Sequence, residues 1–169
     1  YWWGIVDAYP EDCAWVRHWD LAATEGGGAF TSGVLIGRSR TTRMFYVADV
    51  KRVQFSGDKV KKLIKAVAEQ DRMKLGKRYT ISLPQDPGQA GKVQAQDLVA
   101  MLAGFDVKAE KETGEKETRA RPYAAQVEAG NVKLVSGSWV PAYINECAEF
   151  PTGAYLDQVD ASSGAFGCL

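Results

Sequence analysis

The chain has 169 residues, and its 21 basic and 21 acidic side chains give a formal net charge of zero. This length suits one domain with a sizeable hydrophobic core. The balanced charge gives no indication of a nucleic-acid partner, although basic residues could still gather on one face. No segment predicts a membrane span or a signal sequence, so a membrane protein is not expected. Three cysteines without a metal-binding spacing predict reduced thiols in an intracellular protein.

The first part of the chain is expected to form an antiparallel meander followed by a helix. Extended apolar runs separated by glycine-rich or polar turns predict strands at 15–23, 29–38 and 44–55. The spacing of apolar residues then changes to a helical period from Ser56, a suitable N-cap, to Leu75.

The second part alternates strands with helices. Strands are predicted at 79–84, 107–112 and 132–135, and helices at 89–103, in the charged segment ending near 130, at 138–150 and in the last segment. The apolar stripe of the helix at 89–103 is assigned to four residues, Val93, Leu98, Val99 and Leu102. Three antiparallel strands followed by strand–helix units predict an α/β fold, with a mixed central sheet and helices on both faces.

Two aspartates lie close to the start of the last predicted helix. Asp157 and Asp160 are three residues apart and therefore share one helical face, among small and apolar neighbours. They could form a solvated first turn that is favoured by the helix dipole. They could instead be held there to bind a cation.

Two further aspartates occur on the predicted strands. Asp20 lies within the first strand between apolar residues, so it is expected to be partly buried, at a cost of several kcal/mol unless compensated. Asp86 follows the fourth strand, in LPQDPGQAG, and strand ends are where sites assemble in α/β sheets. If these strands are neighbours, Asp20 and Asp86 meet, and the last helix can bring its two aspartates to the same place.

A cluster of four carboxylates has a chemical consequence. Such groups raise one another's pKa unless a cation neutralises them. Oxygen ligands without histidine or cysteine suit Mg²⁺ or Mn²⁺. Two such ions can activate a water molecule and stabilise the leaving oxygen in phosphodiester cleavage.

This order of strands and acids resembles the ribonuclease H-like nuclease superfamily, and four sequence blocks narrow the resemblance. The blocks are WDLAAT, LPQDPGQAGKVQAQDL, TGEKETRARPYAAQVEAGNVKLV and FPTGAYLDQVDASSGAF. Together they resemble the C-terminal nuclease domain of tailed-bacteriophage terminase large subunits, over residues 15–166. The resemblance implies a ribonuclease H-like fold and a metal-dependent endonuclease. Such an enzyme uses two Mg²⁺ or Mn²⁺ ions to cut concatemeric double-stranded viral DNA during packaging.

The resemblance also implies roles for individual residues. Catalytic and metal-binding roles fall on four aspartates: Asp20, Asp86, Asp157 and Asp160. The sequence departs from the usual HDDQVDA ending, because Tyr155 stands where histidine is common and Leu156 where the first aspartate is common. Both outer positions of the DxxDA pattern are nevertheless present.

Basic residues and one histidine have two interpretations each. The mixed-charge run at 110–122 is typical of a solvated face. The resemblance makes three basic residues candidate contacts to DNA phosphates: Lys116, Arg119 and Arg121. Lys92, in the helix-opening turn GQAGK, is a further candidate contact to the DNA backbone. His18 shares a strand face with Asp20 and could act as a general base. A structural role is favoured, because metal ions activate water without a histidine.

The resemblance also predicts the domain organisation. Residues 1–14 are expected to be the stub of a linker from an upstream ATPase domain, and residues 15–169 the nuclease domain. The chain contains no Walker-type phosphate loop, so ATP hydrolysis is assigned to the longer parent chain. Its implied partners are double-stranded DNA, the small terminase subunit and the capsid portal, in the cytoplasm of an infected bacterium. The alternatives are a structure-selective nuclease such as a junction resolvase, or a catalytically silent module that docks on DNA or the portal.

Overall fold

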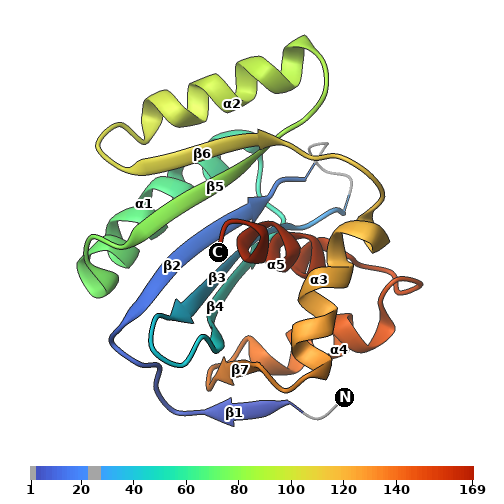
Figure 1. The fold of residues 1–169 in the computed structure, drawn as a ribbon. Helices are drawn as coiled ribbons and strands as arrows, with labels where there is room; N and C mark the ends of the chain where they lie inside the picture. Colours follow the sequence, from blue (N-terminus) through green and yellow to red (C-terminus); the bar gives the residue numbers. More distant parts are fainter. Residues whose placement is uncertain (1–2, 23–27) are drawn as a thin grey trace.

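Seven strands form one mixed sheet in the computed structural model, which describes residues 3–22 and 28–169 (Figure 1). They are β1 (Gly4–Val6), β2 (Cys13–Asp20), β3 (Thr31–Ser39), β4 (Phe45–Val53), β5 (Tyr79–Gln85), β6 (Asp106–Lys111) and β7 (Val132–Val135). Their order across the sheet is β1-β7-β4-β3-β2-β5-β6. The pairs β2–β3 and β3–β4 are antiparallel, and the other neighbours are parallel. The predicted meander joined to parallel strands is confirmed; the end of its first strand and most of the following turn lie outside the described residues.

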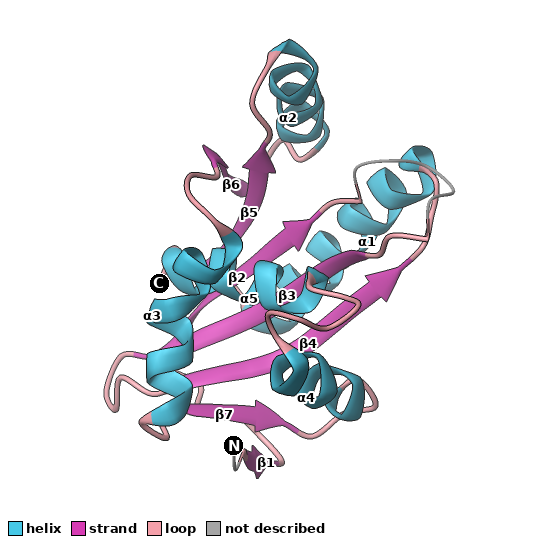
Figure 2. Ribbon diagram, turned by 90° about the vertical axis from the view of Figure 1, so that its right-hand side faces the viewer, coloured by secondary structure: helices cyan, strands magenta, loops and turns pink. Residues whose placement is uncertain are grey.

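Helices cover both faces of the sheet, as predicted (Figure 2). They are α1 (Gly57–Leu75), α2 (Gln89–Met101), α3 (Lys116–Glu128), α4 (Val140–Glu149) and α5 (Asp157–Gly167). The side chains of α1 and α2 join the core on one face, and α3, α4 and α5 form the other layer. None of the helices in the described ranges has the length and apolar character needed to span a membrane.

Alternation along β2 decides which side chains face each helical layer. Trp15 and Trp19 belong to the core beneath α1, whereas Val16 belongs to the core beneath α5. His18 and Asp20 have the same strand parity as Val16. Their side chains therefore lie on the α5 side of the sheet.

Glycines on β3 make room for the two tryptophans of β2. Trp15 pairs with Gly37 across the strands, and Trp19 pairs with Gly33. A Cβ atom at either glycine would come within 2.6 Å of the facing indole ring. The rings therefore lie flat over the neighbouring strand, where they are almost completely buried.

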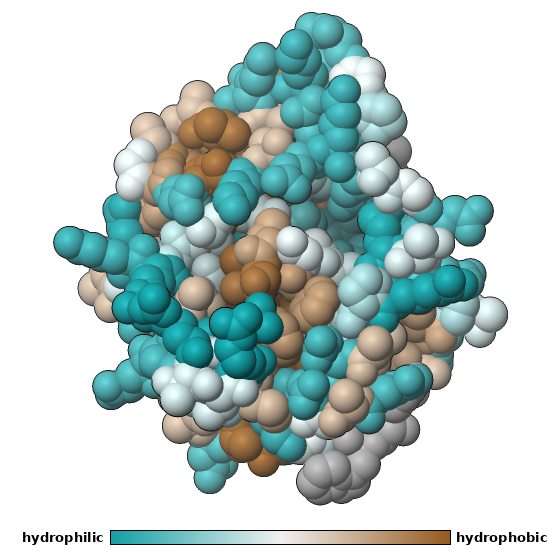
Figure 3. All heavy atoms as spheres, in the orientation of Figure 1, coloured by the Kyte–Doolittle hydropathy of each residue, from teal (hydrophilic) through white to brown (hydrophobic). Residues whose placement is uncertain are grey.

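The apolar stripe predicted for α2 is only half correct. Leu98 and Leu102 are buried, but Val93 and Val99 are 44% and 40% exposed. The helix flanks β5 and β6 near the edge of the sheet, so only a narrow stripe that includes Ala95 contacts the core. Figure 3 shows mostly hydrophilic residues at the top of the view, with a hydrophobic patch beside them at the upper left.

A buried ion network ties β2 to α1 on the face opposite α5. The Arg17 guanidinium is 1% exposed and donates two hydrogen bonds to Asp71, at 2.8 and 2.9 Å. It also donates to Asp49 at 2.8 Å and to the Gly33 carbonyl at 3.0 Å. The Tyr79 hydroxyl donates to Asp71 at 2.7 Å, so the buried charges are surrounded by partners.

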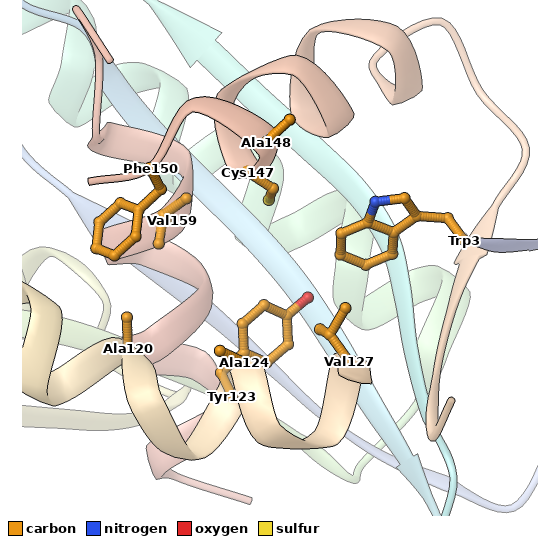
Figure 4. A pocket seen from close by; sticks show the side chains of 9 residues that line it. All are labelled: Trp3, Ala120, Tyr123, Ala124, Val127, Cys147, Ala148, Phe150 and Val159. Carbon is orange, nitrogen blue, oxygen red and sulfur yellow. The ribbon is translucent and has the colours of Figure 1, made fainter. Parts of the chain in front are cut away.

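The segment at 1–14, predicted as a linker stub, takes part in the sheet where it is described. Gly4–Val6 form β1, which pairs in parallel with β7 at the sheet edge. Such a short strand, paired with a segment far along the chain, leaves no local pattern to predict it. Trp3 lines an apolar groove of about 230 Å³ with Tyr123, Val127 and Cys147 (Figure 4). No acidic side chain lines this groove, so it lies apart from the predicted site.

Candidate active site

Three of the four predicted aspartates meet where β2 ends beneath α5. Asp20 is the last residue of β2, not the middle of a strand as predicted. Helix α5 packs across β2 and β3, and it begins at Asp157. The charges of Asp160 and Asp157 both act on the carboxylate of Asp20. The predicted meeting of the strand acid with the helix acids is therefore present in the fold.

The pKa of the Asp20 carboxyl group is raised far above its ordinary value. Burial, and then the negative charges of Asp160, Glu112 and Asp157, raise its pKa from 3.8 to about 8, although the Lys116 ammonium opposes this shift. In the part of the chain that the structure describes, no ion pair neutralises Asp20. A cation bound beside this group would remove the penalty of ionising it.

Asp160 has a cationic partner. Its Oδ2 atom accepts a hydrogen bond from the Lys116 ammonium, at the first residue of α3. Burial raises the pKa of Asp160, and Lys116 opposes that shift. Burial alone would lower the pKa of Lys116, but the ion pair outweighs it and raises that pKa. The positive charge of Lys116 therefore neutralises Asp160 in the structure.

Asp157 is held by a row of side chains across the sheet. Ser32 pairs with Asp20 on one side and with Arg52 on the other, so all three lie level on β2, β3 and β4. The Ser32 hydroxyl donates to Asp157, and Arg52 donates to both oxygens of that carboxylate at 3.0 and 3.2 Å. Bidentate binding by arginine fixes the orientation of Asp157.

The guanidinium of Arg52 packs against two aromatic rings. Its guanidinium carbon lies 3.7 Å from the centroid of Phe30 and 5.0 Å from that of Tyr155. The two rings contact each other edge to face, with centroids 5.1 Å apart. Tyr155, which replaces the usual histidine, therefore supports the arginine that holds Asp157. Neither role was predicted from the sequence, because only the register of β4 against β3 places Arg52 opposite Ser32.

A buried glutamate on α4 was also missed. Glu146 is 6% exposed and accepts hydrogen bonds from the Val159 backbone at 2.7 Å and from Gln158 at 3.0 Å. Burial raises its pKa, and the neighbouring charge of Asp157 adds to the shift. Glu146 thus accepts a hydrogen bond from a backbone N–H group in the first turn of α5, and it fixes the helix that carries the two aspartates. Its spacing of three residues from Val140 to Tyr143 to Glu146, which places it on the buried face of α4, is the signal that could have identified it.

An open pocket leads to these acids. Its volume is about 640 Å³, and its lining includes Asp20, Lys116, Tyr155, Leu156 and Asp157. Leu156 contributes an apolar wall where the family ending commonly has an aspartate. The acids are accordingly reached from solvent along a path with a basic residue on one side.

Asp86 is placed differently from the other three aspartates. β2 and β5 are parallel neighbours, as expected, and their last registered pair is His18 with Ser82. Asp86 follows β5 at the same edge, but it is exposed, and its backbone lies against Gly91 at the start of α2. Burial has the largest effect on the pKa of Asp20, and the charges that act on it are those of Asp160, Lys116, Glu112 and Asp157. The structure therefore does not bring the Asp86 side chain together with Asp20.

The predicted DNA contacts fall into two groups. Lys116 and Arg119 are one helical turn apart on α3 and face the acids, since both affect the pKa of Asp160. Arg119 also lies 3.5 Å from a carboxylate oxygen of Glu112. Arg121 on α3 and Lys92 on α2 are exposed.

The donor set is suited to a hard divalent cation. All its members are carboxylate oxygens, and Asp20 is an acid whose ionisation is strongly disfavoured in the absence of a cation. Within residues 3–22 and 28–169, however, no three histidine, cysteine or acidic side chains are close enough together to hold an ion. The Lys116 ammonium is bound to one carboxylate oxygen of Asp160.

Comparisons with known proteins agree with this fold. A family model described as "Terminase RNaseH-like domain" matches residues 17–166. The P22 large terminase nuclease domain is 14% identical with a TM-score of 0.68, over 96% of this chain and 85% of that chain. The Mn-soaked, inhibitor-bound human cytomegalovirus terminase nuclease domain is 12% identical with a TM-score of 0.67, over 96% and 86%. The large terminase nuclease from thermophilic phage G20c with bound magnesium is 16% identical with a TM-score of 0.67, over 96% and 85%. No curated protein matches the chain.

Proposed function

The chain belongs to the terminase RNase H-like domain family, and we propose that it is a divalent-metal-dependent endonuclease that cleaves concatemeric double-stranded viral DNA during genome packaging. The ribonuclease H-like fold predicted from the sequence is confirmed by the family match and by the three solved structures. Two of those structures, of other proteins, were obtained with manganese or magnesium.

One observation carries the proposal: the charges of both aspartates of α5 act on Asp20, which lines an open pocket with Asp157 and forms no ion pair among the described residues. A module that only docks on DNA would not benefit from converging carboxylates, because they repel phosphates as well as one another. A phosphodiesterase needs such a centre to hold cations against the scissile phosphate.

We assign distinct tasks to the residues of the centre. Asp20 and Asp160 would hold the metal, with Asp157 beside them in the orientation fixed by Arg52 and Ser32. Asp86 remains a proposed ligand that would have to turn toward the pocket. When bound, two Mg²⁺ or Mn²⁺ ions would activate water and stabilise the leaving oxygen.

Lys116 has two tasks in this proposal. Without metal, its ammonium neutralises Asp160. With a cation bound at Asp160, Lys116 would be available at the rim of the pocket to bind a DNA phosphate, as would Arg119 one helical turn away. Arg121 and Lys92 would add contacts to the backbone of the duplex farther from the cut.

We further propose that the domain works within a packaging motor. Its partners there would be an ATPase domain of the parent chain, the small terminase subunit and the capsid portal. The cytoplasm of the infected bacterium is the proposed location of this activity.

Cleavage of two DNA substrates tests the proposal. The chain is incubated with supercoiled plasmid and with a synthetic four-way junction, in Mn²⁺ and in EDTA. We expect nicked and linear plasmid in Mn²⁺ and intact plasmid in EDTA. Cleavage of the junction alone would favour a resolvase, and binding without cleavage in Mn²⁺ would favour a docking module.

A further inference from the structure

Glu112 follows the carboxyl end of β6 in the same way as Asp86 follows the carboxyl end of β5. Gln85 of β5 pairs with Lys111 of β6, and these are the last residues of the two strands. Asp86 and Glu112 are therefore the next residues on adjacent parallel strands. The chain after β5 turns toward α2, whereas the chain after β6 crosses toward α3, on the side of the sheet that carries α5 (Figure 1).

The carboxylate of Glu112 lies among the acids of the proposed site. It lines a cavity of about 210 Å³ together with Asp160 and His18. Its negative charge acts on both Asp20 and Asp160. The neighbouring His18 imidazole, together with the Arg119 guanidinium, lowers the pKa of Glu112, so this acid is ionised where Asp20 is not.

The buried histidine beneath this cavity has one free nitrogen. His18 is 4% exposed, and its Nε2 atom has no hydrogen-bond partner among the described residues. That atom lies 3.8 Å from Oε1 of Glu112, which is longer than a hydrogen bond. A buried polar atom without a partner is uncommon and calls for an explanation in the function of the site.

A serine hydroxyl contacts the imidazole of His18 on the side opposite Glu112. The Cys168 thiol donates to the Ser82 hydroxyl at 3.4 Å, and that hydroxyl lies 2.7 Å from Nδ1 of His18. The neutral tautomer in which Nδ1 accepts from this hydroxyl is the one that suits a carboxylate next to Nε2. The remaining proton of the imidazole is then on Nε2, directed toward Glu112.

The fold gives this ring a fixed position. A Cβ atom at Gly164 would lie 2.4 Å from the imidazole, so α5 can pack this closely only with glycine there. A short movement of Glu112 would complete the hydrogen bond with Nε2. His18 is thus prepared to hold Glu112 in one orientation at the acidic centre.

We propose that Glu112 is a further carboxylate of the metal centre and that His18 is its positioning residue. This inference rests on the proposed metal-dependent nuclease. An ordinary surface ion pair between Glu112 and Arg119 would explain neither the free Nε2 atom nor the closeness of Glu112 to Asp20. Glu112 would hold a bound cation from the end of β6, and the imidazole of His18 would donate a hydrogen bond to its carboxylate.

Binding of Mn²⁺ to the intact chain, measured by isothermal titration calorimetry without DNA, tests the inference. Glu112→Gln should weaken binding by about tenfold or more, which is the usual effect of disturbing a metal site or its immediate supports. Glu110→Gln is the matched control, because Glu110 lines the same cavity but is exposed, and it should bind like the wild type. His18→Ala should weaken binding, and His18→Gln, which keeps an amide donor near Nε2, should restore most of it.

The outcomes separate this inference from the proposed function. If Asp20→Asn abolishes Mn²⁺ binding while Glu112→Gln binds like the wild type, Glu112 has no role at the metal and the inference is overturned alone. If the wild type itself binds no Mn²⁺, the proposed metal dependence fails as well. Melting curves in EDTA accompany each variant. If His18→Ala does not fold, Glu112→Gln and His18→Gln decide the result.

Discussion

Replacement of Asp20 by asparagine should stabilise the metal-free domain. In the folded protein the pKa of Asp20 is about 8, against 3.8 for an ordinary aspartate. The folded state therefore holds an extra proton between about pH 4 and pH 8, and the stability of the wild type falls as pH rises through that window. Asparagine resembles the protonated acid and avoids this loss.

The size of the effect follows from the same shift. At about 1.4 kcal/mol per pKa unit, the shift of the Asp20 pKa from 3.8 to about 8 corresponds to a cost of about 6 kcal/mol for its full ionisation. Water entry and movement of Lys116 raise the effective dielectric constant and reduce this penalty. We expect Asp20→Asn to gain about 2 kcal/mol at pH 8, or roughly 4–8 °C in melting temperature for a domain of this size. At pH 4 the gain should vanish.

Thermal melts by circular dichroism, in EDTA and at several pH values, measure this gain. Asp86→Asn is the matched control, because Asp86 is exposed and its replacement should change stability by less than about 0.5 kcal/mol. An Asp20→Asn variant that melts at or below the wild-type temperature at pH 8 would refute the placement of Asp20 among repelling acids.

Three further predictions concern the core, the DNA and the motor. Asp71→Ala should cost about 3–5 kcal/mol in a urea titration, because it leaves the buried Arg17 charge without its main partner; a loss below 1 kcal/mol would contradict the buried network. Charge-removing substitutions at Lys92, Lys116, Arg119 and Arg121 should weaken binding to DNA duplexes of unrelated sequence to the same extent. They should also reduce the salt dependence of binding, measured by fluorescence anisotropy. An unchanged salt dependence would mean that these residues are only part of a solvated face. The isolated chain should release no phosphate from ATP, with or without DNA; turnover above a no-enzyme control would contradict the proposed division of labour.

Much of the architecture could be predicted because its causes are local. The change from alternating to helical apolar spacing at Ser56 marks the start of α1, which begins at the next residue. Glycine and proline turns mark most strand ends to within a few residues. β1 was missed because three residues carry no period and their partner lies in β7. The exposure of Val93 and Val99 was missed because it depends on how much of α2 the sheet edge covers.

The candidate site was predictable in part, for a similar reason. Asp20, Asp157 and Asp160 are unusual in their local sequence, and the topology brings their elements together. Glu112 and Arg52 are ordinary charged residues in sequence, and only the register of the sheet places them near the acids. The position of the Asp86 side chain depends on the turn into α2, which the sequence pattern alone does not define.

Cleavage of supercoiled plasmid by the wild type and by Asp20→Asn, in parallel and with Mn²⁺ present, tests the central claim most directly. The account predicts nicked and linear products with the wild type and none with the variant, although the variant is folded and at least as stable. Cleavage by Asp20→Asn at the wild-type rate would contradict the claim that this strand-end aspartate is at the centre of the chemistry.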